Sequence, residues 1–170
     1  LSKKINEEIA TLLSKSSKMN IYCLRFFTVY GPYGRPDMLI KNLVDSLFYN
    51  KNFKIYGYGK HYRDFTYIDD VVEILFKIIK SKDKDYKKKL SILNIGSGET
   101  VQLTNLINLL FRKIENMKNP KIKYIEKRKE DVLITHADNK KIKKKYRKIK
   151  FTNIDQGLTK YLEWYYKYYS

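Results

Sequence analysis

The sequence predicts an α/β protein with a largely parallel β-sheet. Short β-favourable runs alternate along the chain with longer segments whose apolar residues recur at helical spacing. Strands separated in this way by helices are typical of parallel sheets. The chain has 170 residues, of which 43% are hydrophobic. This suits one domain, or part of a larger one, with a real core.

The first half of the chain is predicted to contain two helices and three extended segments. Ile5, Ile9, Leu12 and Leu13 form one apolar stripe, and only Ser2 precedes them as a capping residue, so we expect the chain to begin inside a helix. The expected elements are a helix over about 1–18, a strand at Ile21–Phe27, a helix over about Asp37–Tyr49, a short strand at Phe53–Tyr56 and an extended stretch at Asp64–Tyr67.

The second half repeats the alternation. Asp69 and Asp70 stand where carboxylates stabilise a helix N-terminus, and Thr152 or Asn153 is a suitable N-cap for the last helix. The expected elements are a helix at Val71–Lys80, a charged linker at Lys82–Lys89, a strand at Leu90–Ile95, a helix at Leu103–Met117, a strand at Ile122–Ile125, a helix near Asn139–Tyr146 and a final helix to Tyr166 or beyond.

The net charge of +18 comes mostly from lysine. Of the 36 basic residues six are arginines, at positions 25, 35, 63, 112, 128 and 147, and the other 30 are lysines. Clustered cations favour nucleic acids or anionic membranes. The lysine runs at 77–89 and 140–150 contain acidic or apolar residues, however, and no RNA-binding or zinc-finger motif accompanies them. We therefore expect neither nucleic acid nor a membrane as partner, although a basic nucleic-acid-binding domain stays open as the alternative.

The remaining composition points to a cytoplasmic protein without a metal. Cys23 is the only cysteine, which excludes an internal disulfide. Val71–Ile79, the longest mostly apolar stretch, is interrupted by Glu73 and Lys77, and no signal peptide is evident. His61 and His136 lack the spacing of metal ligands, so both are expected in loops.

Gly96-Ser97-Gly98 follows a predicted strand, where a dinucleotide-binding fingerprint would lie. That fingerprint requires a third glycine for close packing of the helix on the strand, and Val101 occupies its position. The stretch is better interpreted as a tight turn from a strand to a helix.

The loop in RFFTVYGPYGRPDM, residues 25–38, is a stronger candidate for ligand binding. Gly31 and Gly34 permit unusual backbone angles and close approach of a ligand, while Pro32 and Pro36 stiffen the path. Arg35 presents a planar set of donors suited to a diphosphate. In open α/β folds ligands bind beyond the carboxyl ends of strands, which is where this loop is predicted to lie.

Arg63 provides a second planar donor, between a turn broken by glycines and a short strand. Two loop arginines in a chain that otherwise uses lysine suggest a phosphate clamp. Each could equally form a surface salt bridge, and a bias in residue usage could make arginine rare.

Five stretches together resemble the carboxyl-terminal half of the NAD-dependent epimerase/dehydratase family, the extended short-chain dehydrogenases, and are most similar to UDP-glucuronate 4-epimerases. These stretches are RFFTVYGPYGRPDM, YGYGKHYRDFTYIDDVVEIL, LNIGSGETVQL, EDVLITHAD and DQGLTKYLEWY. The resemblance implies the carboxyl-terminal part of a Rossmann-like parallel sheet and a smaller α/β substrate-binding domain. Residues 1–30 and about 64–98 would belong to the first, and about 31–63 and 99–170 to the second, with the amino-terminal NAD-binding segment missing.

Ser2-Lys3-Lys4-Ile5-Asn6-Glu7 is similar to the end of the family's Tyr-x-x-x-Lys signature. Lys3 would be the signature lysine, and the catalytic tyrosine would lie two residues before Leu1. Residues four apart share a helix face, so the ammonium group can hold the nicotinamide ribose and lower the pKa of the tyrosine. We therefore expect the chain to be a fragment that is inactive alone. Without the motif, Lys3 would be one solvated lysine among thirty.

In the family the tyrosinate takes the proton of the sugar 4-hydroxyl while hydride passes from C4 to NAD. The keto-sugar then turns over and hydride returns to its other face, so C4 is inverted. The resemblance assigns Lys3, Phe27 and Val29 to NAD, Thr28 to the sugar near C6, Arg35 and Arg63 to the diphosphate, Lys54, Ile55 and Tyr56 to uridine, and Arg128 and Asp131 to a segment that closes over the nucleotide.

This closing segment departs from the family pattern, because Glu130 replaces the usual glycine and Lys129 a usual proline. These two changes put its turn geometry in question. Other activities on the same scaffold also stay open, namely a UDP-glucose 4-epimerase, a dehydratase, a decarboxylase or a reductase. The resemblance further implies a homodimer of the full-length protein through the helix over about 1–18. The tyrosine-rich end around Trp164 is expected to be a packed amphipathic helix.

Overall fold

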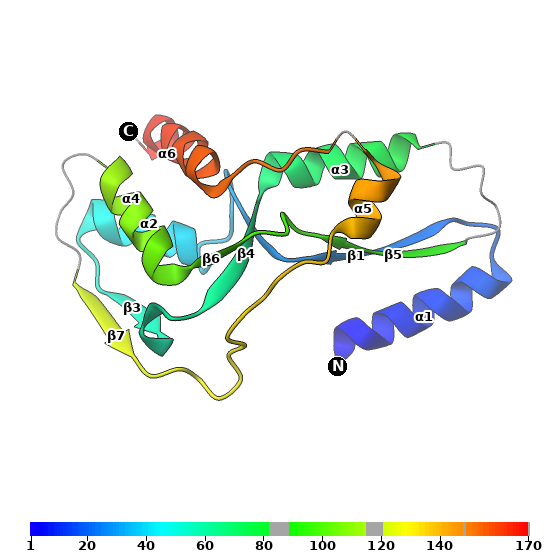
Figure 1. Ribbon diagram of the computed structural model, residues 1–170, viewed down its shortest axis with the longest axis horizontal. Coiled ribbons are helices and arrows are strands. Elements are labelled where there is room, and N and C mark those ends of the chain that lie inside the picture. The colour runs from blue at the N-terminus through cyan, green and yellow to red at the C-terminus, as the bar shows by residue number, and fades with distance from the viewer. Residues whose placement is uncertain (82–88, 115–120, 148, 170) are drawn as a thin grey trace.

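The computed structural model describes residues 1–81, 89–114, 121–147 and 149–169, and its elements alternate as the sequence predicts (Figure 1). The helices are α1 Ser2–Ser16, α2 Leu39–Tyr49, the 3-10 turn η1 Gly57–Gly59, α3 Ile68–Lys80, α4 Leu103–Lys113, α5 Lys140–Lys145 and α6 Ile154–Tyr169. The strands are β1 Ile21–Phe26, β2 Thr28–Tyr30, β3 Phe53–Tyr56, β4 Tyr62–Tyr67, β5 Leu90–Ile95, β6 Thr100–Gln102 and β7 Ile122–Ile125.

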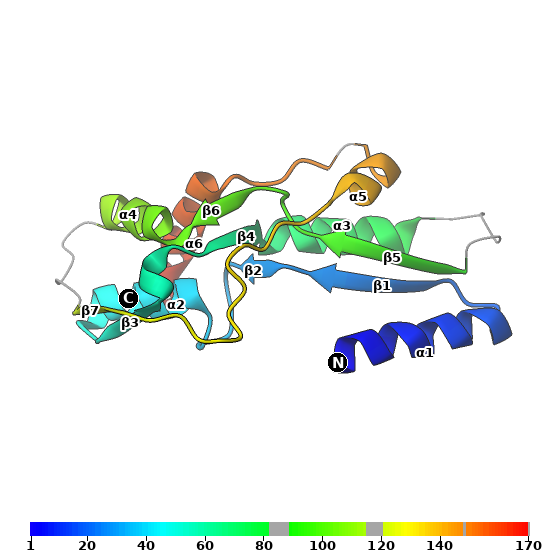
Figure 2. The same cartoon turned by 60° about the horizontal axis from the view of Figure 1, so that its bottom comes forward.

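The strands form three small sheets in which most pairings are parallel. β1 pairs with β5, β2 with β4, and β3 with β7, all in parallel, whereas β4 pairs with β6 antiparallel. The predicted α/β class with largely parallel pairing is therefore confirmed. α1 lies on one side of the β1–β5 pair, and α3 and α5 lie on the other (Figures 1 and 2).

The strand predicted at Ile21–Phe27 is one residue shorter, and the predicted loop after it begins with a second strand, β2. β1 ends at Phe26, Phe27 donates its N–H to Ile95 O at 3.2 Å, and β2 then pairs with β4 instead of β5. The short strands β2 and β6 and the turn η1 were not expected as separate elements. Because β6 follows the Gly96–Gly98 turn, that turn connects two strands and not a strand and a helix.

The predicted helix ends differ from the observed ones by a few residues. α2 begins two residues after Asp37, behind a turn in which Met38 N donates to Arg35 O at 3.1 Å. α3 begins at Ile68, with Asp69 and Asp70 in its first turn. Asn153 caps α6, because its Oδ1 accepts the N–H of Gln156 at 2.9 Å. The charged linker and the predicted end of α4 near Met117 fall largely outside the described residues.

The buried apolar residues form two clusters. The larger one joins α2, β3, β4, α4 and α6, and the smaller one joins α3, β5 and α5. In α6, Leu158, Tyr161 and Tyr165 are each at most 1% exposed, so the tyrosine-rich end is a packed helix.

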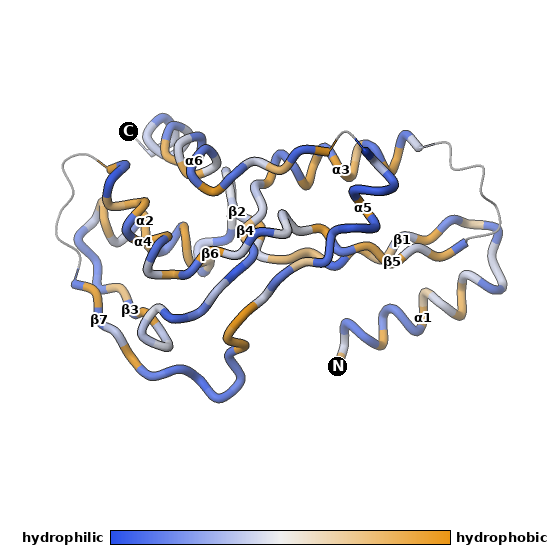
Figure 3. The backbone as a smooth tube through the Cα atoms, in the orientation of Figure 1, coloured by the Kyte–Doolittle hydropathy of each residue, from blue (hydrophilic) through white to orange (hydrophobic). Residues whose placement is uncertain are grey.

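α1 is packed much less completely than the other long helices. Of its residues only Ala10 is buried, while Ile5, Ile9, Leu12 and Leu13 are between 44% and 66% exposed. Apolar segments are visible along α1 in Figure 3. Within the described ranges, no helix is both long and apolar enough to span a membrane.

Candidate functional site

The glycine-containing loop leaves β2 at the edge where the strand ends. Gly31 has φ +143°, and a Cβ there would lie 2.3 Å from Cγ2 of Ile68, so the loop can pass α3 only with glycine at this position. Tyr33 then packs its ring against Trp164 and Tyr168 of α6, with centroids 5.1 and 5.5 Å apart. The contacts of Gly31 with α3 and of Tyr33 with α6 thus fix the part of the loop that precedes Arg35.

Two adjoining cavities lie beside this loop. The first, which we call the loop cavity, has a volume of about 260 Å³ and is lined by Arg35, by Phe27 and by the strand β2 that follows it. The second, the strand cavity, has a volume of about 440 Å³ and is lined mainly by β3, β4 and the 131 segment. The residues that line both are Thr28, Met38, Leu39 and Phe65.

The structure gathers nine of the eleven residues assigned from the sequence around these two cavities. Phe27, Thr28, Val29 and Arg35 line the loop cavity. Thr28, Lys54, Ile55, Tyr56, Arg63 and Asp131 line the strand cavity. Arg35 and Arg63 are therefore on adjoining hollows that share a wall, and not on opposite sides of the molecule.

The two arginines differ in how their charge is compensated. Arg35 donates from Nε to Oδ1 of Asp37 at 2.9 Å and from Nη2 to Oδ2, and this contact lowers the pKa of the Asp37 carboxyl. Arg63 instead donates from Nη1 to two carbonyl oxygens, those of Tyr62 at 2.9 Å and Leu133 at 3.3 Å. Among the described residues no carboxylate forms an ion pair with Arg63. Its guanidinium can therefore bind an anionic group of a ligand.

Arg128 lies at the rim of the strand cavity, over Tyr56. Its Nη2 donates to the Tyr56 hydroxyl at 2.6 Å, and the guanidinium carbon lies 4.1 Å from the ring centroid. The turn that leads to Asp131 closes through Asp131 N and Arg128 O at 3.1 Å. Glu130 is not among the described residues with positive φ, so this turn forms without the glycine that the family pattern would place there.

The segment after Asp131 runs beside β4. Tyr62 N donates to Leu133 O at 2.8 Å, and Thr135 N donates to Tyr62 O at 3.1 Å. These bonds place the Arg128–Asp131 turn next to Arg63, although the two are far apart in the sequence.

Asp64 is a buried residue of the site that the sequence reasoning missed. It is 0% exposed, and its carboxylate accepts from the backbone N–H groups of Ser97, Gly98 and Ala137 at 2.9–3.0 Å and from Ser97 Oγ at 2.8 Å. The amides of the glycine turn are thus directed at a carboxylate of the protein and not at a cofactor phosphate. The available signal was a charged residue at the start of the predicted extended stretch Asp64–Tyr67.

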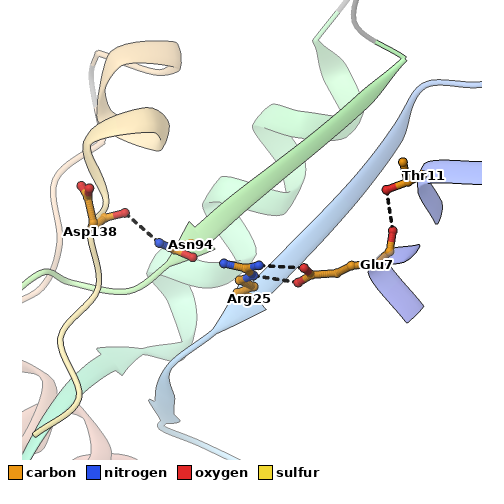
Figure 4. Close-up of polar contacts among 5 residues, drawn as sticks. All are labelled: Glu7, Thr11, Arg25, Asn94 and Asp138. Atoms are coloured by element: carbon orange, nitrogen blue, oxygen red, sulfur yellow. Dashed lines mark hydrogen bonds and ion pairs between the residues drawn. The ribbon is translucent and has the colours of Figure 1, made fainter. Parts of the chain in front are cut away.

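Lys3 lies in a different place from the two cavities above. It lines a third hollow together with Glu7, Arg25 and Phe26. Glu7 and Arg25 form a bidentate ion pair, with both N–O distances 2.7 Å, which connects α1 to β1, and Asn94 of β5 donates to Asp138 O at 3.1 Å (Figure 4). The structure therefore does not bring Lys3 together with the other assigned residues, although Phe26 adjoins Phe27 in the chain.

His61 is the second residue that the sequence reasoning missed. It lies outside the helices and strands, as expected, but it is only 2% exposed and lines the strand cavity. His136, by contrast, is exposed, with Nε2 3.0 Å from Gly98 O.

Comparison with known proteins adds an independent observation. Residues 1–96 match the model of the NAD dependent epimerase/dehydratase family. The chain belongs to this family. It spans about half the length of the curated relatives it matches.

Individual relatives of this family member are named as epimerases and dehydratases. The UDP-glucuronate 4-epimerase of Thermodesulfobacterium geofontis is 37% identical over 147 residues, which cover 86% of this chain and 43% of the relative. The UDP-glucuronic acid 4-epimerase of Bacillus cereus, solved with UDP-glucuronic acid and NAD, is 26% identical with a TM-score of 0.83, covering 96% of this chain and 50% of that one. TunA, an NAD-dependent NDP-hexosamine 5,6-dehydratase, is 27% identical with a TM-score of 0.70, covering 87% and 46%.

Proposed function

We propose that this chain is the nucleotide-sugar-binding half of a UDP-glucuronate 4-epimerase, which inverts C4 of the sugar by transient oxidation. The observation that carries the proposal is the pair of adjoining cavities, because residues from five separate stretches of sequence meet there. The relatives named as UDP-glucuronate 4-epimerases support the choice of substrate.

The pyrophosphate is assigned to the two arginines. A guanidinium donates two parallel hydrogen bonds to a phosphate, and such charge-assisted bonds are about twice as strong as neutral ones. Arg63 has carbonyl partners only, and Arg35 would exchange the exposed Asp37 carboxylate for the phosphate. Both arginines border the wall formed by Thr28 and Met38, so one diphosphate between the cavities can contact each.

The other ligand groups follow from their positions along the cavities. Lys54, Ile55 and Tyr56 of β3 would hold the uridine, with Arg128 covering Tyr56. Thr28 stands on the shared wall and offers a hydroxyl to the sugar near C6. Asp131 would close the nucleotide side of the strand cavity.

The residues at the end of β1 fit a nicotinamide ring. Phe27 and Val29 give the loop cavity an apolar wall next to Thr28, as a planar apolar ring requires. Bound NAD would accept a hydride from sugar C4 and return it to the other face. We assign Lys3 to the nicotinamide ribose. The division of the chain into a Rossmann-like part, residues 1–30 and about 64–98, and a substrate-binding part also stays a proposal.

Calorimetric titration of the chain with UDP and UDP-glucuronate tests the binding site. We expect both ligands to bind, and Arg63→Gln to weaken UDP binding about tenfold or more, because a hydrogen bond to a charged group contributes about 1.5–3 kcal/mol. Arg147→Gln is the matched control, since Arg147 is exposed and lines a separate groove with Phe76. Equal effects of the two substitutions would contradict the phosphate clamp.

Turnover tests the fragment hypothesis separately. We expect the chain mixed with NAD and UDP-glucuronate to give no UDP-galacturonate, because the signature tyrosine would lie before Leu1. A longer protein that includes the preceding segment should give it. Conversion by the present chain alone would show that the catalytic assignment is wrong.

A dehydratase is the second candidate function, supported by the likeness to the dehydratase TunA. Chromatography of the products of the longer protein separates the two, since a dehydratase forms a new unsaturated or keto sugar and an epimerase forms an isomer. Binding to nucleic acid with a steep dependence on salt, and none to UDP, would favour the basic-domain alternative. A homodimer through the apolar stripe of α1 and a cytoplasmic location stay predictions.

A further inference from the structure

His61 occupies a position that the proposed chemistry has not yet used. It lies between η1 and β4, is 2% exposed, and lines the strand cavity together with Tyr56 and Arg63. A histidine this deeply buried is unusual in a connecting segment, because loops normally keep their polar side chains in water.

The preceding turn is shaped around the imidazole. Gly57 has φ +60°, and a Cβ there would lie 2.0 Å from Cε1 and 2.6 Å from Nδ1 of His61. Lys60 N closes the turn on Gly57 O at 3.0 Å, and Leu103 N donates to His61 O at 3.0 Å. The ring is therefore held in one place by both its backbone and its neighbours.

One nitrogen of this ring is without a partner. Nε2 is buried and forms no hydrogen bond to any of the described residues. An unsatisfied buried polar atom is destabilising, and such atoms in folded proteins usually bind a ligand or an internal water. The position of His61 on a cavity wall favours the ligand.

The chemistry of the neighbouring groups indicates which part of a ligand would be involved. Lys54, Arg63 and Asp131 are charged and suit charged ligand groups, whereas the single nitrogens of an imidazole ring also form hydrogen bonds with uncharged groups. The ring of His61 packs on Gly57, which directly follows Tyr56, so the ring lies beside the end of β3. Its counterpart is therefore an uncharged hydrogen-bonding group and not the diphosphate.

We propose that Nε2 of His61 forms a hydrogen bond to the nucleoside of the bound nucleotide, at the uracil edge or a ribose hydroxyl, and thereby contributes to the choice of nucleotide. This inference rests on the proposed UDP-sugar function. It adds a specificity-determining residue that is not among the residues assigned to the ligand by resemblance.

Nitrogen NMR of the chain labelled with ¹⁵N-histidine tests the contact directly, because the protein contains only two histidines. His136→Gln assigns the two sets of signals, and His136 serves as the internal control since it is exposed and contacts Gly98 O. Saturation with UDP should shift Nε2 of His61 and leave His136 unchanged, and inorganic pyrophosphate should shift neither. UDP binding that leaves His61 unchanged overturns the inference and leaves the proposed function intact. Absence of UDP binding refutes the proposed function and the inference with it.

Two conservative substitutions test the same nitrogen by affinity. The glutamine amide reaches roughly the position of Nε2, whereas the asparagine amide reaches only that of Nδ1. His61→Gln should therefore keep the UDP dissociation constant within about threefold, and His61→Asn should raise it about tenfold, the equivalent of one lost hydrogen bond. If both variants melt like the parent and bind UDP equally, the inference is wrong. If either fails to fold, the NMR titration of the parent decides.

Comparison of nucleotides then distinguishes the two possible partners of Nε2, the uracil edge and a ribose hydroxyl. Replacing UDP by CDP changes the edge of the base, and replacing it by 2′-deoxy-UDP removes a ribose hydroxyl. The analogue that lacks the bonded group should bind the parent and His61→Asn with similar affinity. If His61→Asn weakens the binding of UDP and of both analogues by the same factor, a hydrogen bond to either group is refuted.

Discussion

The part of the molecule around the strand cavity and the part around α1 are built from similar amphipathic elements but differ in how completely they are packed. In α4, Leu106 and Leu110 are 0% exposed, while in α1 the corresponding apolar stripe is about half exposed. The cavities thus rest on a closed core, whereas Lys3 is on a helix joined to β1 through the exposed Glu7–Arg25 pair. This difference predicts that substitutions beside the cavities and substitutions in α1 will differ in their effects on stability.

Asp64 connects the two parts, and its removal should have the largest effect on stability. Its carboxylate joins β4 to the Gly96–Gly98 turn and to Ala137. Asp64→Ala removes the acceptor of the Gly98 and Ala137 N–H groups, at about 1–3 kcal/mol each, so we expect a loss of roughly 4 kcal/mol in the free energy of unfolding. Urea denaturation followed by circular dichroism measures it.

Asp64→Asn is the matched control for this prediction. The amide keeps the shape and one acceptor oxygen, so its loss should be clearly smaller than that of alanine. An unchanged stability of Asp64→Asn would mean that Asp64 contributes by filling space and not by accepting hydrogen bonds with both oxygens.

Truncation of one leucine in each part measures the packing difference itself. Leu106 is fully buried in the larger cluster and Leu12 is 66% exposed on α1. Leu106→Ala should lower the free energy of unfolding by about 3 kcal/mol, the usual cost of a buried cavity. Leu12→Ala should change it by no more than about 0.5 kcal/mol. A large effect at Leu12 would show that its stripe is covered in solution, for instance by a second copy of the chain, and dilution would then lower the stability.

The order of the elements could be predicted from local patterns, and the details that depend on distant contacts could not. The stripe Ile5 to Leu13 and the β-favourable run Leu90–Ile95 each predict their element, because periodicity is a local property. The break at Phe27 is not local: it arises because β1 pairs with β5 and β2 pairs with β4. The three-residue strands β2 and β6 have too few residues to show an alternation of their own.

The candidate site shows the same limit. The two arginine loops are recognisable in the sequence, since glycines and a rare arginine stand together in each, and the first also contains two prolines. Asp64 and His61 are not, because their importance arises from burial: the carboxylate of Asp64 accepts five hydrogen bonds, and Nε2 of His61 has no partner among the described residues. The position of Lys3 apart from the cavities was also not predictable, since the resemblance assigns a role and not a distance.

Alkaline pH should destabilise the closed core through its buried tyrosines. Burial raises the pKa of Tyr30, Tyr161 and Tyr165 above the ordinary value of about 10, and all three belong to the larger cluster. A raised pKa in the folded state means that the unfolded chain loses the proton first. The contribution of these hydroxyls to stability is therefore complete below pH 10 and declines above it.

Urea denaturation between pH 8 and 11 should show this decline, beginning near pH 10. Absorbance of tyrosinate at the same pH values provides the internal comparison, because the three buried tyrosines should ionise only when the chain unfolds. A Tyr161→Phe variant removes one buried hydroxyl that has no hydrogen-bond partner among the described residues, so it should reduce the pH dependence without weakening the core. If the stability of the variant depends on pH as strongly as that of the parent, burial of the Tyr161 hydroxyl is not a cause of this dependence. The core would then be packed less completely at α6 than at α4.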